Sequence, residues 1–438
     1  MTGSPSVTPL SPPSPSPPSP SSLPLRAIPG GYGWPVVGPI IDRLNYFWFQ
    51  GPPTFFKKRM EKYKSTVFRT NVPPTFPWFL GVNPNVIAVL DVKSFSHLFD
   101  MEIVEKANVL VGDFMPSVKY TGDFRVCAYL DTSEAKHTQI KNFSLDILKR
   151  SSTIWVPSLI SSLDSMWDKI DADVANSGSA SSFLLMQQFL FRFLTRCIVG
   201  ADPSTSPEIA SSGHIMLDKW LGIQILPTVN IGILQPLEEL FLHSFSYPFW
   251  LVKGDYNKLV HAIGDQKSTG LHEKLRDEVR QKSGSNSNTL SFESVKDMEL
   301  VQSFVYETLR LNPPVPSQFA RARKDFKLTS HDAVYEIKKG ELLCGYQPLV
   351  MKDAKVFEES PATFLYDRFT REKGGTELLN YLYWSNGPQT GSATAANKQC
   401  AAKEIVPLTA ALFVAYLFQR YDDITISSGS ITAVEKSK

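Results

Sequence analysis

Apolar residues recur along most of this chain at the spacing of helices, and only short stretches have the composition of strands. From Ile140 to about Tyr256 they return every three or four residues, which predicts a series of helices. Residues 290–311 continue this pattern up to a pair of prolines, where a helix is expected to end. Residues 67–72 and 86–90 are rich in β-branched residues and are separated by Pro, Gly and Asn, so we expect two short strands there.

The second half of the chain mixes short strands with one long helix. Residues 325–330, 333–346 and 349–353 are predicted to form short strands and turns. The last long helix is expected to begin just after Cys400, where an apolar run follows a loop of small residues. The predicted fold class is therefore mainly α with small β-sheets.

The N-terminal residues 1–24 are almost all Pro and Ser. Such a segment buries too little apolar surface to offset the entropy of ordering it, so we expect it to be disordered. No acidic residue precedes Asp42, and Arg26 is the only basic residue before it. This pattern fits both a plastid transit peptide and a plain low-complexity tail. We expect one ordered domain over residues 25–438.

Composition narrows the classes of partner and compartment. Lys and Arg number 45 and Asp and Glu 43, so the net charge of +2 argues against a nucleic-acid partner. The four cysteines, at positions 127, 197, 344 and 400, form no CxxC pair. We therefore expect neither a disulfide framework nor a structural zinc site, and a reducing compartment. No run of about eighteen apolar residues occurs, which predicts no transmembrane helix.

Several common catalytic motifs are missing from the sequence, namely the GxSxG elbow, the Walker A loop and the HExxH pair. One remaining feature is the pair Glu307 and Arg310, which a spacing of three places on one helix face. Such pairs are usually solvated and contribute little to stability. Here the pair lies in an apolar helix, where a buried pair needs a further partner, and Arg368 is a candidate.

The other feature is Cys400, which follows a loop rich in Gly, Ser and Thr and precedes an apolar helix. A thiolate is a soft ligand for iron, and an axial thiolate pushes electron density toward a bound oxygen. A loop of small residues lets a flat macrocycle approach the backbone. The alternative is a buried structural cysteine, because most free cysteines are buried structural residues.

The order ExxR, then "FLYDRF", then a cysteine loop opening a helix resembles the cytochrome P-450 superfamily. The opening "IPGGYGWPVVGPI" is similar to the proline-rich hinge of that superfamily. This resemblance implies a heme-thiolate fold, with Glu307, Arg310 and Arg368 as a buried triad supporting the heme core. It also implies that Cys400 is the proximal ligand of a heme b iron.

The cysteine loop differs from that of the monooxygenases, because Lys398 stands two residues before the cysteine and Ala402 two after it. "NGPQTGSATAANKQCAA" instead resembles the plant fatty-acid hydroperoxide enzymes, as does nearly the whole chain from about Leu25. These are allene oxide synthases, hydroperoxide lyases and divinyl ether synthases. The sequence of this chain is most similar to the 13-hydroperoxide lyase branch. A classical monooxygenase is not expected.

The resemblance also assigns roles around the heme. It implies that Lys106, His137, Lys141 and Lys398 contact the heme propionates, two carboxylates that need cationic partners in an apolar slot. Leu110 stands where allene oxide synthases carry a Phe that is thought to stabilise a carbon radical, and a leucine there is the lyase-like residue.

The implied reaction needs neither O2 nor a redox partner, because the substrate already carries the O–O bond. The heme iron would cleave that bond homolytically, and the radical would rearrange to a hemiacetal that breaks into an aldehyde and a shorter oxo-acid. For 13-hydroperoxides of linolenic or linoleic acid, the products would be a six-carbon aldehyde and a twelve-carbon oxo-acid. The expected location is the plastid, with peripheral membrane association, and otherwise the cytoplasm.

One departure from the family concerns the distal helix that crosses the heme. After "GDYNKL", which ends at Leu259, only ten residues precede "GLHEKLRDEVR", and ten helical residues span about 15 Å. We therefore expect a deletion near 259–270 that removes most of this helix and an Asn thought to contact the hydroperoxide. A splice variant, a gene-model error and a degenerate copy all remain open. So do allene oxide or divinyl ether synthesis, and an inactive relative that binds heme or fatty acid.

Overall fold

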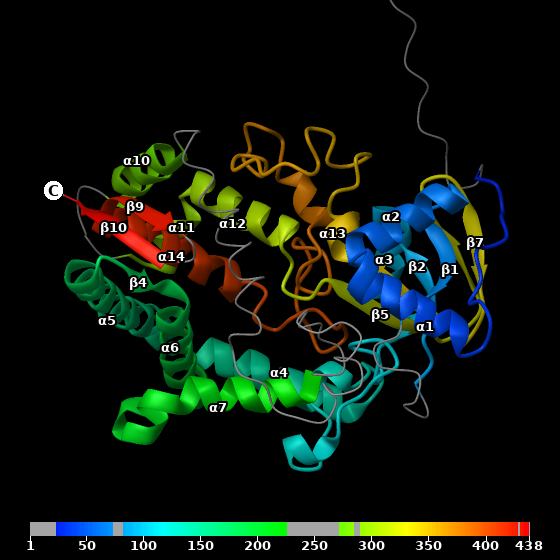
Figure 1. Ribbon diagram of the computed structural model, residues 1–438, viewed down its shortest axis with the longest axis horizontal. Coiled ribbons are helices and arrows are strands. Elements are labelled where there is room, and N and C mark those ends of the chain that lie inside the picture. Colours follow the sequence, from blue (N-terminus) through cyan, green and yellow to red (C-terminus); the bar gives the residue numbers. More distant parts are fainter. Residues whose placement is uncertain (1–22, 73–81, 226–270, 284–289, 428–429, 438) are drawn as a thin grey trace, which may run out of the picture.

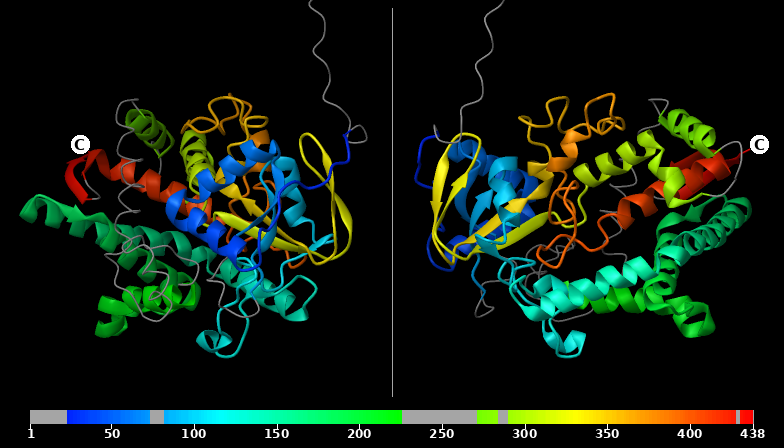
Figure 2. Two further views of the ribbon diagram at one scale, coloured as in Figure 1. Left: turned by 45° about the vertical axis from the view of Figure 1, so that its right-hand side comes forward. Right: turned by 180° about the vertical axis from the view of Figure 1, so that it is seen from behind.

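The computed structural model describes residues 23–72, 82–225, 271–283, 290–427 and 430–437 (Figure 1). Residues 1–22 of the Ser/Pro-rich segment and the expected deletion near 259–270 lie outside the described residues, as does the helix prediction for 226–256. Figure 2 shows a helical part and a sheet-containing part lying side by side from two further directions.

The helical part is packed around one large apolar core (Figure 1). Its helices are α4 Ala135–Arg150, α5 Ser152–Ser177, α6 Ser182–Leu194, α7 Pro207–Ile225, α10 Leu271–Ser283, α11 Phe292–Lys296, α12 Glu299–Leu311 and α14 Ile405–Arg420. A three-stranded sheet of order β4-β10-β9 packs beside them. Its strands are β4 Ala180–Ser181, β9 Tyr421–Ser427 and β10 Ser430–Lys436. The core side chains come from residues far apart in the chain, such as Leu159, Val301 and Leu412.

The second part is built on a five-stranded sheet of order β1-β2-β8-β5-β3. Its strands are β1 Val67–Asn71, β2 Asn85–Val89, β3 Val104–Glu105, β5 Ser317–Ala322 and β8 Leu342–Tyr346, and β6 Phe326–Thr329 with β7 Val334–Ile337 forms a separate hairpin. The helices of this part are α1 Val37–Leu44, α2 Pro52–Tyr63, α3 Val92–Ser96 and α13 Gln347–Val350. β8 is parallel to β2 and antiparallel to β5, and this central place explains why all five of its residues are buried.

Helix α12 lies where the chain crosses between the two parts. Its inward positions Val301 and Val305 pack in the helical core, and the helix ends at Leu311 because Pro313 and Pro314 cannot continue it. The chain then enters β5, and residues 351–404 lead back from the sheet to α14. This long return segment carries Arg368 and Cys400, so both reach the junction of the two parts.

The predicted class is confirmed, since the fold is mainly helical with small sheets. β1 and β2 occupy the two predicted strand segments. The helix expected over 290–311 is present but interrupted at Asp297 and Met298, which separate α11 from α12. The ordered chain also includes Pro24, whose carbonyl oxygen accepts a hydrogen bond of 3.0 Å from the Val334 N–H.

Two local predictions are wrong. Residues 349–353 were expected as strand and turn, but Leu349 and Val350 belong to helix α13, whose Pro348 favours a helix start. The last helix does not begin directly after Cys400, because residues 401–404 form turns and α14 begins at Ile405.

Among the described residues, the stretch Ser182–Val199 is long and apolar enough to cross a membrane by length and composition, with a mean hydropathy of 1.2. This stretch corrects the sequence-based expectation that no segment of the chain is long and apolar enough to cross a membrane. Leu185, Phe189 and Phe193 of this stretch pack in the helical core. Core helices of globular proteins meet the same criterion, so this is weak evidence for a membrane span.

Candidate functional site

Three charged side chains predicted to act together meet inside the protein. The guanidinium of Arg310 donates to both carboxylate oxygens of Glu307 at 2.7 Å each. Arg368 Nε donates to the same two oxygens at 3.1 and 3.2 Å. Glu307 and Arg310 are fully buried and Arg368 is 5% exposed, so this is an interior network and not a surface pair.

The remaining donors of the two arginines are bound by backbone carbonyl groups of the return segment. Arg310 donates to the carbonyl oxygens of Met351 and Pro361 at 2.6 and 2.7 Å. Arg368 donates to those of Glu359 and Ser360 at 2.7 and 3.0 Å. These bonds attach the end of α12 to the segment that leads to Cys400, and they compensate the dehydration of the charges.

The loop before Cys400 is held by a dense set of hydrogen bonds. Cys400 N–H donates to the Ser385 carbonyl at 2.8 Å, and the Asn386 amide donates to the Lys398 carbonyl at 2.9 Å. Asn386 has a φ of 63°, which an asparagine tolerates better than most residues. Gln399 folds its side chain inward and donates to the Pro388 carbonyl at 2.6 Å. The cysteine itself is exposed, so its sulfur is available to a ligand.

Lys106 is buried beside this loop, and none of the described carboxylates pairs with its ammonium. Its ammonium donates to the side-chain oxygen of Asn386, and only 5% of the residue is exposed. Burial, together with the nearby charge of Lys398, lowers the pKa of Lys106 to about 7. An anion that reaches this buried ammonium would therefore strongly stabilise its charged form.

Lys141 and Lys398 approach the same loop from α4 and from the loop itself. Lys398 Nζ donates to the carbonyl oxygens of Cys127 and Leu130 at 2.6 Å each. Lys141 donates to the Gln399 carbonyl, next to the cysteine. Burial lowers the pKa of Lys398 to about 8 and also lowers that of Lys141. Neither ammonium forms an ion pair with any of the described carboxylates.

His137 completes the cluster from the first turn of α4. It is fully buried, and neither ring nitrogen has a hydrogen-bond partner of good geometry in the described chain. Burial comes first among the causes that lower its pKa, followed by the charges of Lys398 and Lys141. The charge of Asp131 and then the backbone at Ala395 oppose this shift. Unsatisfied buried nitrogens are rare and call for a ligand.

The structure therefore brings together all four residues that the resemblance assigned to the propionates. Lys106, His137 and Lys141 each lie within electrostatic range of Lys398, which belongs to the Cys400 loop. Burial lowers the pKa of all four basic groups, so a ligand with carboxylates would offset the cost of charging them. A sulfur donor beside basic side chains is a donor set that fits a heme with its carboxylates.

Leu110 lies in the loop between β3 and α4 and is partly buried. No contact in the described chain ties it to the cation cluster or to Cys400, so its place near a substrate stays a prediction. The preceding Val109 is buried in the core of the sheet part, which fixes the start of this loop.

Sequence reasoning missed the residues that support this cluster, among them Asp131 and Arg323. Asp131 accepts hydrogen bonds from the Lys106 N–H at 2.9 Å and from Arg323 Nη2 at 2.5 Å. Burial alone would raise the pKa of Asp131, but bonds from Ser133, Lys106 and Arg323 hold it well below its usual range. Asp131 is therefore engaged by Arg323, and its charge offsets only part of the effect of burial on His137 and Lys398, whose pKa values stay lowered. Only its place at the end of the loop before α4 could have drawn attention to it.

The fold is mainly helical and brings a buried glutamate–arginine triad and an exposed cysteine to its junction, as the cytochrome P450 resemblance led us to expect. A cytochrome P450 family profile matches residues 267–390. This family implies a heme iron. Within it, the chain belongs to the family of plant fatty-acid hydroperoxide lyases and allene oxide synthases.

Three relatives carry this assignment. The chain is 63% identical to "Fatty acid hydroperoxide lyase, chloroplastic" of Solanum lycopersicum, over 98% of this chain and 99% of the relative. It is 52% identical to "Linolenate hydroperoxide lyase, chloroplastic" of Arabidopsis thaliana, over 99% and 96%. It is 38% identical to "Allene oxide synthase, chloroplastic" of Linum usitatissimum, over 97% and 87%.

Proposed function

We propose that this chain is a heme-dependent lyase that cleaves fatty-acid 13-hydroperoxides, of linolenic and linoleic acid, in oxylipin biosynthesis. The products are a six-carbon aldehyde and a twelve-carbon oxo-acid. The observation that supports the heme site is the cluster of buried and partly buried basic groups beside the Cys400 loop, which form no ion pair with the carboxylates of the described residues. The high identity to two named hydroperoxide lyases supports the assignment of the reaction.

Heme b is the cofactor that we assign to this site. Lys106, His137, Lys141 and Lys398 bind its two propionates, and the burial that weakens their charge in isolation is then offset by ion pairing. Cys400 would supply the sulfur ligand from a loop already fixed by hydrogen bonds, so little ordering entropy would be lost on binding. The Glu307 network holds the segment that ends in this loop.

When bound, the heme iron supplies the homolytic cleavage of the O–O bond. The protein then has to hold the fatty chain, keep water away from the open face and direct the radical. Leu110 presents an aliphatic side chain where an aromatic ring would hold a carbon radical in place. A flexible apolar wall of this kind favours rearrangement and chain cleavage over formation of an allene oxide.

The comparison with allene oxide synthases favours the lyase as well. Relatives with that name are 36–40% identical to the chain, compared with 63% and 52% for the two lyases. Divinyl ether synthesis has no specific observation in its favour. Because the hydroperoxide already carries the O–O bond that is cleaved, no redox partner protein is proposed. A plastid location follows the word "chloroplastic" in the names of both lyases.

A second candidate, a relative of low or no activity, is favoured by the length of the chain. The alignment with the tomato lyase has 478 positions, 40 more than the 438 residues of this chain, so at least 40 positions have no counterpart here. This supports the missing distal helix that we place near 259–270. One relative, 48% identical over 77% of the chain, is itself named "Probable inactive linolenate hydroperoxide lyase".

The test is product analysis with linolenic-acid 13-hydroperoxide, beside a heme spectrum of the purified protein. Volatile six-carbon aldehyde, detected by gas chromatography, supports the lyase. Ketols from a hydrolysed allene oxide would contradict it. A heme-loaded protein that leaves the hydroperoxide intact would support the inactive relative.

A further inference from the structure

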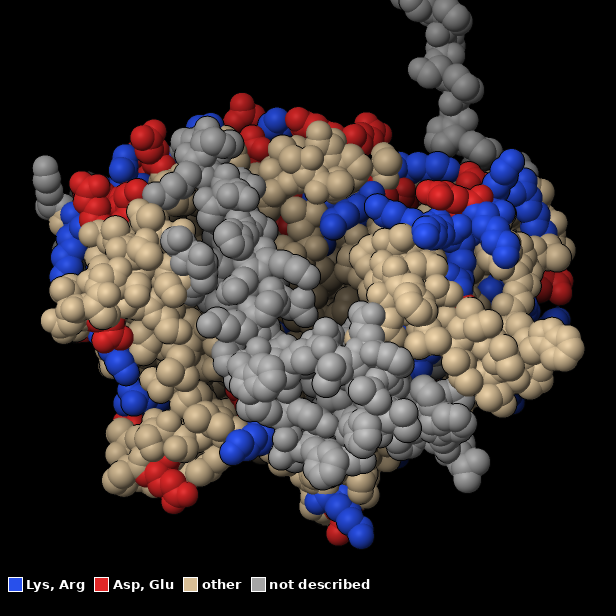
Figure 3. Space-filling model, viewed as in Figure 1, with Lys and Arg blue, Asp and Glu red and all other residues tan. Residues whose placement is uncertain are grey.

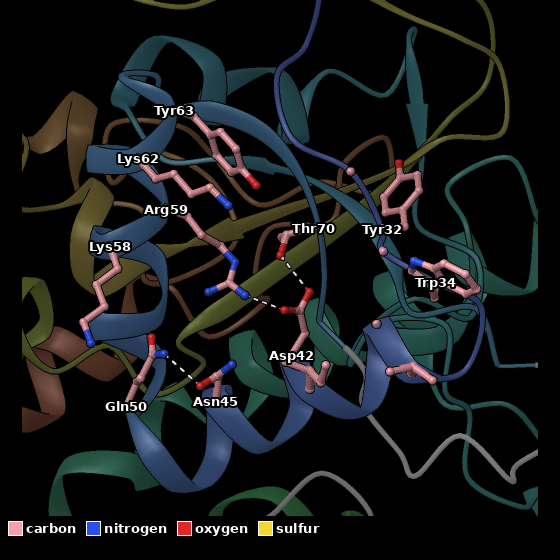
Figure 4. A pocket seen from close by; sticks show the side chains of 15 residues that line it. Tyr32, Trp34, Asp42, Asn45, Gln50, Lys58, Arg59, Lys62, Tyr63 and Thr70 are labelled. Carbon is pink, nitrogen blue, oxygen red and sulfur yellow. Dashed lines mark hydrogen bonds and ion pairs between the residues drawn. The ribbon is translucent and has the colours of Figure 1, made fainter.

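Many of the described cations of this protein pair with a carboxylate. In the cleft between α1 and α2, for example, Arg59 pairs with Asp42 (Figure 4). Along the upper edge of the molecule in Figure 3, Lys and Arg likewise lie beside Asp and Glu. Lys106 departs from this pattern, because the acceptor that its buried ammonium meets is a neutral amide, that of Asn386.

The amide of Asn386 is held in one orientation by its two side-chain partners. Its nitrogen donates to the Lys398 carbonyl at 2.9 Å, and its oxygen accepts from Lys106 Nζ. A reversed amide would place its NH2 group against the ammonium, so both partners select the same orientation. The backbone N–H of Asn386 also donates to the Tyr383 carbonyl at 3.0 Å, which fixes the start of the side chain. The amide oxygen is therefore held toward Lys106.

The ammonium of Lys106 reaches this amide from the edge of the five-stranded sheet. Lys106 directly follows β3, and its backbone N–H donates to Asp131 at 2.9 Å. Its Nζ lies 5.1 Å from the centre of the Phe99 ring, within the range of a cation–π contact. Among the residues that the structure describes, the Asn386 oxygen is the only hydrogen-bond acceptor of this ammonium. A lysine ammonium has several N–H donors, so the others remain for a further acceptor.

The same amide ties this cation to the sulfur of the Cys400 loop. Asn386 bonds to the carbonyl of Lys398, two residues before Cys400. The neighbouring Ser385 accepts a hydrogen bond of 2.8 Å from the Cys400 N–H. Two adjacent residues thus hold the backbone on both sides of Gln399, so the positions of the Lys106 ammonium and of Cys400 are coupled. A ligand that needs both groups finds them already ordered, which lowers the entropy lost on binding.

We propose that Asn386 is a positioning residue for the cofactor: its neutral oxygen holds the Lys106 ammonium at the Cys400 loop and leaves the charge for a heme carboxylate. This inference rests on the heme-dependent function proposed above. An aspartate would adopt the same backbone conformation, but it would neutralise Lys106 in the heme-free protein and repel an entering carboxylate. Without a side-chain acceptor at this position, the ammonium would have to be ordered when heme binds.

The first test compares Asn386→Asp with Asn397→Asp in the full chain. Asn397 lies on the same loop, and its amide also donates to a backbone carbonyl, that of Ser392, at 2.8 Å. Both substitutions remove such a bond and add one negative charge, so they form a matched pair. In titrations of the heme-free protein with hemin, followed by absorbance, Asn386→Asp should weaken the affinity by about tenfold or more. Asn397→Asp should leave the affinity nearly unchanged.

The heme-free protein gives a second readout, which a purely structural role of Asn386 would not move. Burial lowers the pKa of Lys106, so the wild type should gain stability between pH 7 and pH 9. A carboxylate at position 386 would keep Lys106 charged in the folded protein. The gain should therefore disappear in Asn386→Asp and persist in Asn397→Asp. The other charged groups beside Lys106 are Lys398 and Asp131, and both variants keep them.

A further variant, Asn386→Gly, permits the φ of 63° and removes the side chain without adding charge. It should weaken hemin binding less in a Lys106→Met background than in the wild type, because part of its effect acts through Lys106. An equal loss in both backgrounds would overturn the proposal, as would an unchanged pH dependence in Asn386→Asp. A wild type that binds no hemin would overturn the proposed function itself, whereas normal hemin binding with either of those results would overturn only the role of Asn386.

Discussion

The carboxylate of Glu307 accepts hydrogen bonds of 2.7 Å from Nε and from Nη2 of Arg310, with neither side chain exposed to solvent. The two residues are three positions apart in α12, yet their role is not that of a local helix pair. Arg310 also reaches the carbonyl of Met351, 41 residues further on, and the Leu365 N–H donates to Glu307 at 3.0 Å. The pair therefore joins a helix to the segment that carries the cysteine loop.

Removal of this carboxylate should destabilise the protein strongly. Glu307→Ala leaves two buried guanidinium groups without an anion, which is expected to cost roughly 3–5 kcal/mol. The measurement is urea denaturation followed by circular dichroism, together with the heme content of the soluble fraction. We expect insoluble protein, or a soluble fraction with little heme.

A matched control lies on α11, where Glu293 pairs with Lys296 at the same spacing and at 2.8 Å, but on the exposed surface. Glu293→Ala should change the free energy of unfolding by less than about 1 kcal/mol. If Glu307→Ala were as stable and as rich in heme as this control, the buried network would have no structural role.

Sequence periodicity predicted the elements whose pattern is local. Strands β1 and β2 and the helices from α4 to α7 follow from spacing alone. Strand β5 did not, because its sequence SQFARA alternates weakly and its position depends on pairing with β8, with Ala320 opposite Leu343. The turn after Cys400 was also missed, since hydrogen bonds from Lys403 to the distant Gly391 carbonyl hold it.

The candidate site illustrates the same limit. Glu307 and Arg310 were visible as an unusual charged pair within an apolar helix. Lys106 and Lys398 are nearly 300 residues apart, and each alone looks like a surface charge. Only the resemblance to a family selected them, and only the fold shows that buried Lys106 lies close to the partly buried Lys398.

Replacement of Cys400 should remove the thiolate signature of the heme. In the reduced protein with carbon monoxide, the wild type is expected to show the red-shifted band of thiolate ligation, and Cys400→Ser should lack it. Cys127→Ser is the control, because Cys127 also lies beside Lys141 and Lys398. Retention of the band in Cys400→Ser, or its loss in Cys127→Ser, would show that Cys400 is not the ligand.

Buried Lys106 should give the heme-free protein a pH-dependent stability. Its pKa is lowered from 10.5 to about 7 by burial first and by Lys398 second, so the unfolded chain holds this proton up to a higher pH. Stability therefore rises as the pH increases from about 7 toward 10.5, and it falls as the pH decreases toward 7. The measurement is the urea midpoint at pH 7 and pH 9.

Lys106→Met isolates this contribution, since it keeps much of the volume and removes the charge. The variant should gain stability over the wild type at pH 7, and the difference should shrink at pH 9. It should also bind heme more weakly, because one propionate loses a partner. A constant difference between the two proteins at both pH values would mean that Lys106 does not titrate in this window.

The residue at position 110 should influence the choice of product. Leu110→Phe puts an aromatic ring where we place the carbon radical, so products should move from aldehyde toward an allene oxide and its ketols. The comparison requires a chain with the distal helix restored, so that turnover is measurable. Leu110→Ile serves as the aliphatic control and should keep the aldehyde. If both substitutions gave the same product ratio, Leu110 would lie away from the reacting carbon.

Restoration of the missing segment should raise the activity of the 438-residue chain. The family's distal helix forms the roof of the heme pocket and places a polar side chain near the peroxide, and at least 40 aligned positions of the tomato lyase have no counterpart here. A chain that lacks this distal helix would leave the open face of the iron accessible to water. The apolar surface that directs the radical would also be incomplete. A misplacement of about 1 Å can cost about a hundredfold in rate, so loss of a whole wall should cost more.

The experiment inserts the family's distal-helix segment after Leu259 and measures the turnover of a 13-hydroperoxide per bound heme. A control insert of equal length, made of Gly and Ser, separates the effect of the helix from that of chain length. We expect a rise of more than about a hundredfold with the helix and none with the control. Equal turnover by the unmodified and the repaired chain would show that another segment already covers the heme. In that case the chain would be an active lyase despite the gap.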